Sequence, residues 1–275
     1  MKRNPLLLAL AFLAAMAAPA ATLYVDAGST NPIAPYTNWP TAAAVTQDAV
    51  DAAQPGDTVL VTDGIYATGG RAVPYSYGLM SNRVTVDRTI TLRSVNGPEG
   101  TIIKGYQVPG TTNGDGAVRC VFLAGGATLG GFTITNGATR TAQSEEDWLG
   151  EEVLAGGIWC EPDHISISSA VVSNCVIVGN SAFEGAAGVM RGTMKNCVLQ
   201  NNTGFDEGGG AHSATLINCT LIGNVSTLNG GGAANCNLTN CTFIGNSAFA
   251  GGAVSECDVG REALGGPSMR MTRVL

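Results

Sequence analysis

Four consecutive 22-residue units make up residues 170–257: AVVSNCVIVGNSAFEGAAGVMR (170–191), GTMKNCVLQNNTGFDEGGGAHS (192–213), ATLINCTLIGNVSTLNGGGAAN (214–235) and CNLTNCTFIGNSAFAGGAVSEC (236–257). Each unit carries an Asn-Cys pair and a second asparagine six residues after the first. The resulting columns are Asn174, Asn196, Asn218 and Asn240; Cys175, Cys197, Cys219 and Cys241; and Asn180, Asn202, Asn224 and Asn246. A fixed period of this length is the signature of a solenoid.

Apolar and less apolar positions alternate within each unit. Cys175 and Ile177 belong to apolar columns, whereas Val176 belongs to a β-branched column that holds threonine in later copies. Period-two alternation predicts short strands, with Cys175 and Ile177 pointing inward and Val176 facing outward or half-buried. Glycine and asparagine interrupt any helical pattern. The unit therefore predicts one coil of a parallel β-helix, with successive coils about 4.8 Å apart.

The repeated asparagines and cysteines have structural roles in such a stack. Side-chain amides at one position of successive coils are expected to hydrogen-bond along the stack, and asparagine also tolerates the left-handed backbone of a sharp bend. The four repeated cysteines would point inward in parallel, which is poor geometry for a disulfide and favours a ladder of buried thiols. Because the chain has eight cysteines and an export signal, disulfide pairing also stays open.

Several segments resemble known β-helix proteins. The stretch 243–246 (FIGN) followed by 251–254 (GGAV) resembles the FxxN and GGA[ILV] motifs of polymorphic outer membrane proteins. The segments 49–61 and 127–137 are similar to coils of pectin-lyase-like proteins. The resemblance implies an all-β, right-handed, single-stranded parallel β-helix over about 22–257. That fold hosts lyases, hydrolases, adhesins and autotransported passengers.

The domain organisation follows from composition. Residues 1–20 read as a secretory signal, with Lys2 and Arg3, an apolar stretch and an Ala18-Pro19-Ala20 cleavage site. The β-helix domain is predicted at 21–257, with an N-terminal cap at 22–56 and regular repeats at 170–257. The cap is expected to contain a helix over 41–53 with Thr41 as its N-cap. The segments 67–82, 105–117 and 138–155 are expected to be loops.

The last 18 residues lack the repeat pattern. Residues 258–275 are predicted to be an irregular tail, which either covers the last coil or ends a truncated form of a longer surface protein. The signal predicts a secreted or cell-surface protein, outside the bacterial inner membrane. No other stretch of 18 apolar residues occurs, so no transmembrane segment is expected beyond the signal.

Charge and composition exclude some function classes. Only 13% of the residues are charged and 38 of 275 are glycine, which is too apolar for a disordered chain and suits stacked strands with tight turns. The net charge of −7 argues against a nucleic-acid partner, because phosphate binding needs a basic surface.

Three acids form the first candidate site. Glu184 and Asp206 are 22 residues apart and should stack on adjacent coils, with Glu207 beside them. Hard oxygen ligands of this kind bind Ca²⁺, which is the only cofactor that the sequence suggests. The resemblance to pectate lyases implies clustered acids for Ca²⁺ and an arginine base, for which Arg191 is the nearby candidate. The favoured interpretation is that Glu184 and Asp206 are solvated turn residues, and no catalytic residue is assigned.

An acidic segment with two tryptophans forms the second candidate site. Exposed aromatic rings stack on sugars, and carboxylates hold Ca²⁺ or a basic partner. The binding candidates are Glu145, Glu146, Asp147, Trp148 and Trp159. A solvated helix with one tryptophan anchored in the core is the favoured interpretation. His212 aligns with Met190 and Ala234 in neighbouring units, so the repeat gives no support to Ser-His-Asp catalysis.

These observations lead to two functional hypotheses. The first is an exported, non-catalytic β-helix surface protein for adhesion or for binding a polysaccharide or a cell-surface protein. It rests on the regular stack, which carries few titratable residues. The alternative is a polysaccharide lyase or hydrolase acting on an acidic polysaccharide.

Overall fold

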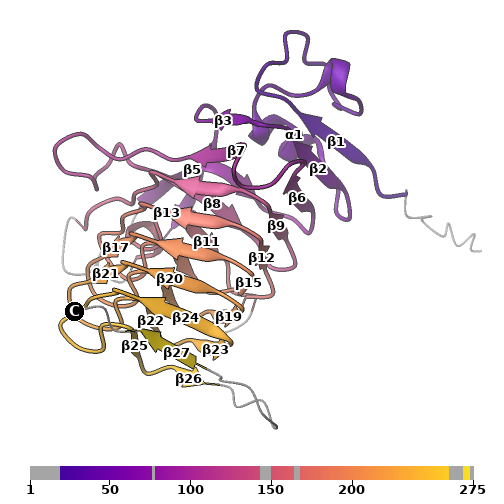
Figure 1. The fold of residues 1–275 in the computed structure, drawn as a ribbon. Helices are drawn as coiled ribbons and strands as arrows, with labels where there is room; N and C mark the ends of the chain where they lie inside the picture. Colours follow the sequence, from indigo (N-terminus) through magenta and orange to yellow (C-terminus); the bar gives the residue numbers. More distant parts are fainter. Residues whose placement is uncertain (1–18, 76–77, 143–149, 164–167, 260–268, 273–275) are drawn as a thin grey trace, which may run out of the picture.

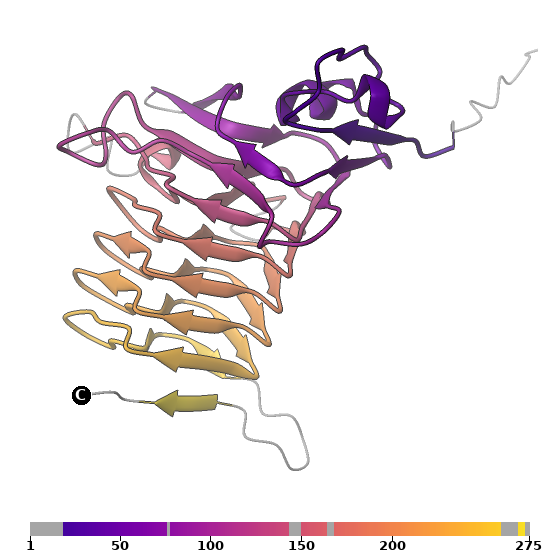
Figure 2. The same cartoon turned by 45° about the horizontal axis from the view of Figure 1, so that its top comes forward.

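The chain winds into a right-handed parallel β-helix in the computed structural model, which describes residues 19–75, 78–142, 150–163, 168–259 and 269–272. Figure 1 shows the coils stacked from the N-terminal cap to the last orange and yellow strands, and Figure 2 shows the same stack from another side. The fold class predicted from the 22-residue period is confirmed.

Three parallel sheets form the sides of the stack. Sheet A contains β1 (Thr22–Val25), β2 (Thr58–Val61), β6 (Thr91–Ser94), β9 (Thr128–Gly130), β12 (Val171–Ser173), β15 (Thr193–Lys195), β19 (Thr215–Ile217), β23 (Asn237–Thr239) and β26 (Asp258–Val259). Sheet B contains β3 (Gly64–Tyr66), β7 (Thr101–Lys104), β10 (Thr133–Thr135), β13 (Val176–Val178), β16 (Val198–Gln200), β20 (Thr220–Ile222), β24 (Cys241–Ile244) and β27 (Met269–Thr272).

Sheet C completes each coil. It contains β4 (Arg71–Tyr75), β5 (Gly78–Val86), β8 (Val118–Leu123), β11 (Ile158–Cys160), β14 (Val189–Met190), β18 (Ala211–His212), β22 (Ala233–Ala234) and β25 (Val254–Ser255). A smaller pair, β17 (Thr203–Gly204) and β21 (Val225–Ser226), lies in the turns between sheets B and C. Because each coil runs from A to B to C, these turns occupy one corner of the whole stack.

In the regular coils, the strands pair in a register that matches the 22-residue period of the sequence. Ile177 pairs with Leu199, Leu199 with Leu221, and Leu221 with Phe243. Val176 and its equivalents in the later copies are half-buried, while the Ile177 column is buried, as the alternation predicts. The stack therefore has one continuous apolar core inside the three sheets.

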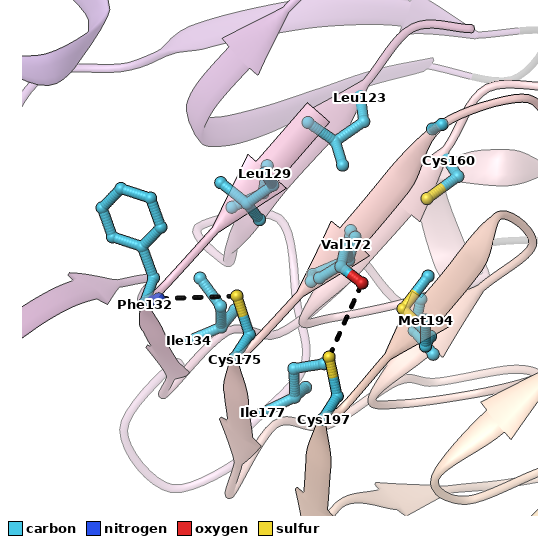
Figure 3. Packing of buried hydrophobic residues seen from close by; sticks show 14 of the residues in the cluster. Leu123, Leu129, Phe132, Ile134, Cys160, Val172, Cys175, Ile177, Met194 and Cys197 are labelled. Carbon is cyan, nitrogen blue, oxygen red and sulfur yellow. Dashed lines mark hydrogen bonds between the residues drawn. The ribbon is translucent and has the colours of Figure 1, made fainter. Parts of the chain in front are cut away.

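The cysteine column lies in that core. Cys175, Cys197, Cys219 and Cys241 are at most 2% exposed, and all eight cysteines of the chain are free thiols. The Cys197 Sγ donates to the Val172 carbonyl of the preceding coil at 3.7 Å, and the Cys175 Sγ accepts from the Phe132 main-chain nitrogen at 3.4 Å. Figure 3 shows both contacts among the surrounding aliphatic side chains. The thiols pack as small apolar groups that also satisfy nearby main-chain atoms.

The two asparagine columns differ in their environments. Asn174, Asn196, Asn218 and Asn240 turn the chain from sheet A into sheet B, with φ between 50° and 55°. Asn180, Asn202 and Asn224 are at most 1% exposed and form a ladder of side-chain hydrogen bonds that ends at Asn246. The exposed column therefore serves backbone conformation and also joins its amides at the surface, where the Asn240 Nδ2 donates to the Asn218 Oδ1 at 2.8 Å. The buried column satisfies polar groups inside the stack.

The N-terminal helix is shorter than the sequence predicts. A 3-10 turn, η1 (Trp39–Thr41), is followed by helix α1 (Thr46–Ala52), which contacts β1 and β5. The expected N-cap at Thr41 is wrong, because the chain first pairs with β1: the Ala43 main-chain nitrogen donates to the Tyr24 carbonyl at 2.9 Å. This extended pairing delays the helix to Thr46.

The expected loop at 67–82 is also partly wrong. It contains β4 and the start of β5, which pair antiparallel with Val73 opposite Met80. The segments 105–117 and 138–155 carry no strand within the described residues, although the second includes the 3-10 turn η3 (Glu151–Val153).

Both ends of the sequence are described only in part. The predicted signal, 1–20, lies almost wholly outside the described residues. From the tail, β26 pairs with β23 and β27 pairs with β24, so two sheets each gain a strand where no repeat columns occur. Within the described part of the chain, no helix has the length and apolar character needed to cross a membrane.

Candidate functional site

A groove of about 550 Å³ lies along the corner where sheet B turns into sheet C. We call it the lateral groove. It is lined by Gln107, Thr111, Thr112, Asn113, Gly179, Asn180, Ser181, Ala182, Phe183, Asn201, Thr203, Gly204, Phe205 and Thr227. These residues come from the turns of three successive coils and from the segment 107–113. None of the described lining residues carries a charged side chain, so the groove offers amides, hydroxyls and aromatic rings.

The segment 107–113 forms a wall that is tied to the coils. The Gln107 Nε2 donates to the Gly179 carbonyl at 2.9 Å. The side-chain amide of Asn113 lies 2.8 Å from the Ser181 Oγ at one end and 3.0 Å from the Thr139 Oγ1 at the other. The contacts of Gln107 with Gly179 and of Asn113 with Ser181 join residues about 70 positions apart in sequence and fix one side of the groove.

Phenylalanines occupy equivalent positions of successive coils along the groove. Parallel bridges two residues earlier, Ser181 with Thr203 and Thr203 with Val225, set the register. Phe183 is half-buried and Phe205 is 44% exposed, and both line the groove. The third coil has Thr227 at this position, while the fourth has Phe249, which is 91% exposed. The corner thus carries a column of rings beside polar groups.

Sequence reasoning missed this column. Its signal is the same 22-residue period that aligns the asparagines, since Phe183, Phe205 and Phe249 are spaced by one and then two units. The groove itself was not predictable in this way, because its wall belongs to a segment outside the repeats.

The outward face of sheet C brings other candidate residues into register. Trp159 pairs with Met190, Met190 with His212, and His212 with Ala234. The predicted alignment of His212 with Met190 and Ala234 agrees with this pairing. The side chains along this row change from buried to half-exposed toward His212.

Trp159 is not an exposed stacking residue. It is 1% exposed and packs with Phe122, and its Nε1 donates to the Glu161 Oε2 at 2.8 Å. The guanidinium groups of Arg119 and Arg191 lie 5.5 and 4.7 Å from its ring centroid. Trp159 therefore anchors the surface of sheet C, as the favoured interpretation held. The other binding candidates, Glu145, Glu146, Asp147 and Trp148, lie outside the described residues.

The three candidate acids lie in the turns next to sheet C. Glu184 is only 5% exposed, so the interpretation of a solvated turn residue is wrong for it. Its neighbour across the turn is Leu154, whose backbone bridges to it, and its Oε1 has no hydrogen-bond partner among the described residues. Burial, and then the charge of Asp206, raise the pKa of Glu184 to about 7. Burial and the charge of Glu207 also raise the pKa of Asp206.

These acids do not converge on one point. Within the described part of the chain, no group of three or more His, Cys, Asp or Glu side chains is placed to hold a metal ion. Arg191, the candidate base, has its Nε and Nη1 buried without a hydrogen-bond partner among the described residues. Burial lowers the pKa of its guanidinium.

Glu207 contacts His212 instead. The Glu207 Oε2 lies 2.7 Å from the His212 Nε2, and the Ser213 Oγ lies 3.1 Å from the His212 Nδ1. Sequence reasoning discounted His212 because its neighbours in the repeat do not share its chemistry. The interaction joins a turn to the following strand of the same coil, which column alignment does not reveal.

The fold relates this chain to a solved structure of another protein. A rhamnogalacturonan lyase superposes with a TM-score of 0.53 at 15% identity, over 90% of this chain and 65% of that chain. The two share the parallel β-helix fold. The chain spans 65% of the length of that lyase, and identity this low shows the fold alone.

A second solved structure shows a weaker similarity. A pectin methylesterase in complex with a hexasaccharide matches with a TM-score of 0.43 at 12% identity, over 82% of this chain and 67% of that chain. No protein-family model matches the sequence, and neither does any curated protein.

Proposed function

We propose that this protein is an exported β-helix that binds a neutral polysaccharide along the lateral groove. The observation that carries the proposal is the placement of Phe183 and Phe205 on consecutive coils within a groove whose other lining residues are uncharged and mostly carry amides or hydroxyls. Sugar rings present C–H faces that pack on aromatic rings, and hydroxyls that pair with amide groups. A groove that crosses three coils suits an extended chain better than a single sugar.

The uncharged groove and the negative net charge of the chain together favour a neutral polysaccharide over an acidic one. No charged side chain lines the described groove, and the net charge of the chain is −7. A polyuronate would be repelled by that field and would find no cation in the groove. A neutral polymer meets no such barrier, so it is the preferred ligand class.

Export and surface attachment belong to the same proposal. The signal-like composition of 1–20 supports export, and the FxxN and GGA[ILV] pattern of the last repeats supports a relation to surface proteins. The β-helix would then present the lateral groove outside the cell, where glycan binding would serve adhesion to a glycan-bearing surface.

A glycan panel tests the proposal. Affinity electrophoresis through gels containing neutral polysaccharides (xylan, mannan, β-glucan) or polyuronates should retard the protein in at least one neutral polymer and in no polyuronate. Retardation only by polyuronates, or by none of the polymers, would overturn the proposed ligand class.

A second candidate function is cleavage of an acidic polysaccharide. The observation that favours it is the raised pKa of the Glu184 carboxyl beside Asp206, together with the Arg191 Nε and Nη1, which have no hydrogen-bond partner among the described residues. Within the described residues, Glu184, Asp206 and Glu207 are not grouped to hold Ca²⁺, so these three acids would not supply a metal site for such an enzyme. Absorbance of unsaturated products from polyuronates, measured with and without Ca²⁺, separates this activity from binding alone.

A further inference from the structure

The residues around His212 form a hydrogen-bonded chain at the surface of sheet C. His212 ends β18 and Ser213 follows it, while Glu207 comes from the preceding turn. The side chains of His212 and Glu207 are 16% and 33% exposed, and Ser213 is half-buried, so all three are accessible. The Asn235 Nδ2, one coil further along, donates to the same Glu207 Oε2 at 3.1 Å.

The contacts define the tautomer of the imidazole. Two groups lie near Nε2: the Glu207 Oε2, an acceptor, at 2.7 Å and the Asn235 Nδ2, a donor, at 3.1 Å. We assign the hydrogen to Nε2, because the carboxylate contact is the shorter one and the Asn235 Nδ2 already donates to the Glu207 Oε2. The Nδ1 atom then has a free lone pair and accepts from the Ser213 hydroxyl at 3.1 Å. A hydroxyl donating to an imidazole that in turn donates to a carboxylate is the hydrogen-bond order of an activated nucleophile.

We propose that Ser213, His212 and Glu207 form an ester-hydrolysing site for short-chain acyl esters, with Ser213 as nucleophile, His212 as general base and Glu207 as the positioning acid. Asn235 holds the carboxylate of Glu207 against the imidazole. The site lies on the outward face of sheet C, outside the residues that line the lateral groove, and it does not depend on glycan binding there.

The reaction balances without a cofactor. The Ser213 Oγ bonds to the ester carbonyl carbon as its proton moves to the His212 Nδ1. The C–O bond to the alcohol then breaks, and the alkoxide takes the proton from Nδ1. Water attacks the acyl-serine, again losing a proton to Nδ1, and the Ser213 oxygen recovers that proton as the carboxylic acid leaves. General-base assistance of this kind contributes about 10²–10⁴-fold to rate.

Covalent labelling tests the nucleophile directly. A fluorophosphonate probe should add once to the wild-type protein, and peptide mapping should place the adduct on Ser213. Ser213→Ala should abolish the adduct, and His212→Gln should slow its formation at least about 10²-fold. Ser173→Ala, a half-buried serine on sheet A, is the matched control and should label like wild type. Circular dichroism of each variant verifies folding.

Turnover of p-nitrophenyl acetate tests the role of Glu207. Glu207→Gln places an amide donor against Nε2, which favours the tautomer with the hydrogen on Nδ1 and removes the acceptor for Ser213. The variant should lose kcat by at least about 10²-fold with KM unchanged. Absence of labelling in the folded wild type, labelling that persists in Ser213→Ala, or full kcat in Glu207→Gln would overturn the proposal.

Discussion

The Asn224 side-chain oxygen holds Asn202 of the preceding coil by two hydrogen bonds: the Asn224 Oδ1 accepts from the Asn202 Nδ2 at 2.9 Å and from the Asn202 main-chain nitrogen at 3.1 Å. The Asn202 Nδ2 also donates to the Ile177 carbonyl at 2.9 Å. Asn202 is fully buried, so no water replaces these bonds. The ladder therefore satisfies main-chain groups that the turn between sheets B and C leaves unpaired.

Asn202→Ala should destabilise the protein by about 3 kcal/mol or more, because it leaves several buried donors and acceptors unsatisfied at about 1–3 kcal/mol each. Urea unfolding followed by circular dichroism measures the change. Asn218→Gly is the matched control, since Asn218 is exposed with a φ of 55° that glycine adopts freely, and it should cost less than about 1 kcal/mol. Equal losses for the two variants would contradict the distinction between the columns.

Cys257 should be the first thiol to react in the native protein. It is half-buried, whereas the other seven cysteines are buried, and a hydrogen bond with Cys236 lowers its pKa to about 7. The thiolate fraction therefore rises between pH 6 and pH 8, and labelling by a maleimide should accelerate over that range. Cys257→Ser should remove the fast phase, as followed by intact mass. A labelling pattern spread evenly over the eight thiols would contradict this prediction.

The raised pKa of Glu184 should make the protein less stable as pH rises, because the buried carboxyl must then give up its proton. Its pKa in the folded protein is about 7 against an ordinary value of 4.5, so the folded state holds a proton that the unfolded state has released. The free energy of unfolding should thus fall between about pH 4.5 and pH 7, by at most about 3 kcal/mol from this group. Asp206 acts in the same direction.

Glu184→Gln keeps the shape of the side chain without its charge. It should flatten the pH dependence and raise the free energy of unfolding at pH 8, as measured by urea unfolding at several pH values. Asp163→Asn, a carboxylate on the surface, is the control and should keep the slope of the wild type. An unchanged slope in Glu184→Gln would mean that this carboxyl is ionised in the folded state.

The repeat region was predictable from sequence because the fold repeats its own contacts. In a parallel stack, a residue meets its equivalent 22 positions away, so alignment of the units already gives the pairing of Ile177 with Leu199 and the ladder of Asn180 with Asn202. The groove was not predictable, because its wall depends on the Gln107 contact with Gly179, which joins a non-repeating loop to the coils.

The burial of Glu184 also escaped prediction for a physical reason. The sequence places Glu184 in a glycine-rich turn that looks solvated, yet the neighbouring segment at Leu154 lies against it. The environment of Glu184 is therefore made by a non-repeating segment, whose position the 22-residue repeat does not encode. For Trp159 the sequence left two interpretations, an exposed ring and an anchor in the core, and the guanidinium groups of Arg119 and Arg191 together with Met190 enclose it.

The most direct test of the central claim is calorimetric titration of Phe205→Ala with oligosaccharides of the neutral polymer that retards the wild type. Loss of one stacking ring should weaken binding by about 1 kcal/mol, or roughly fivefold, and Phe183→Ala should act likewise. Ile65→Ala removes a side chain that is 62% exposed on β3, away from the groove, and should bind like wild type. Binding by Phe205→Ala and Phe183→Ala equal to that of Ile65→Ala would show that the glycan does not occupy the lateral groove.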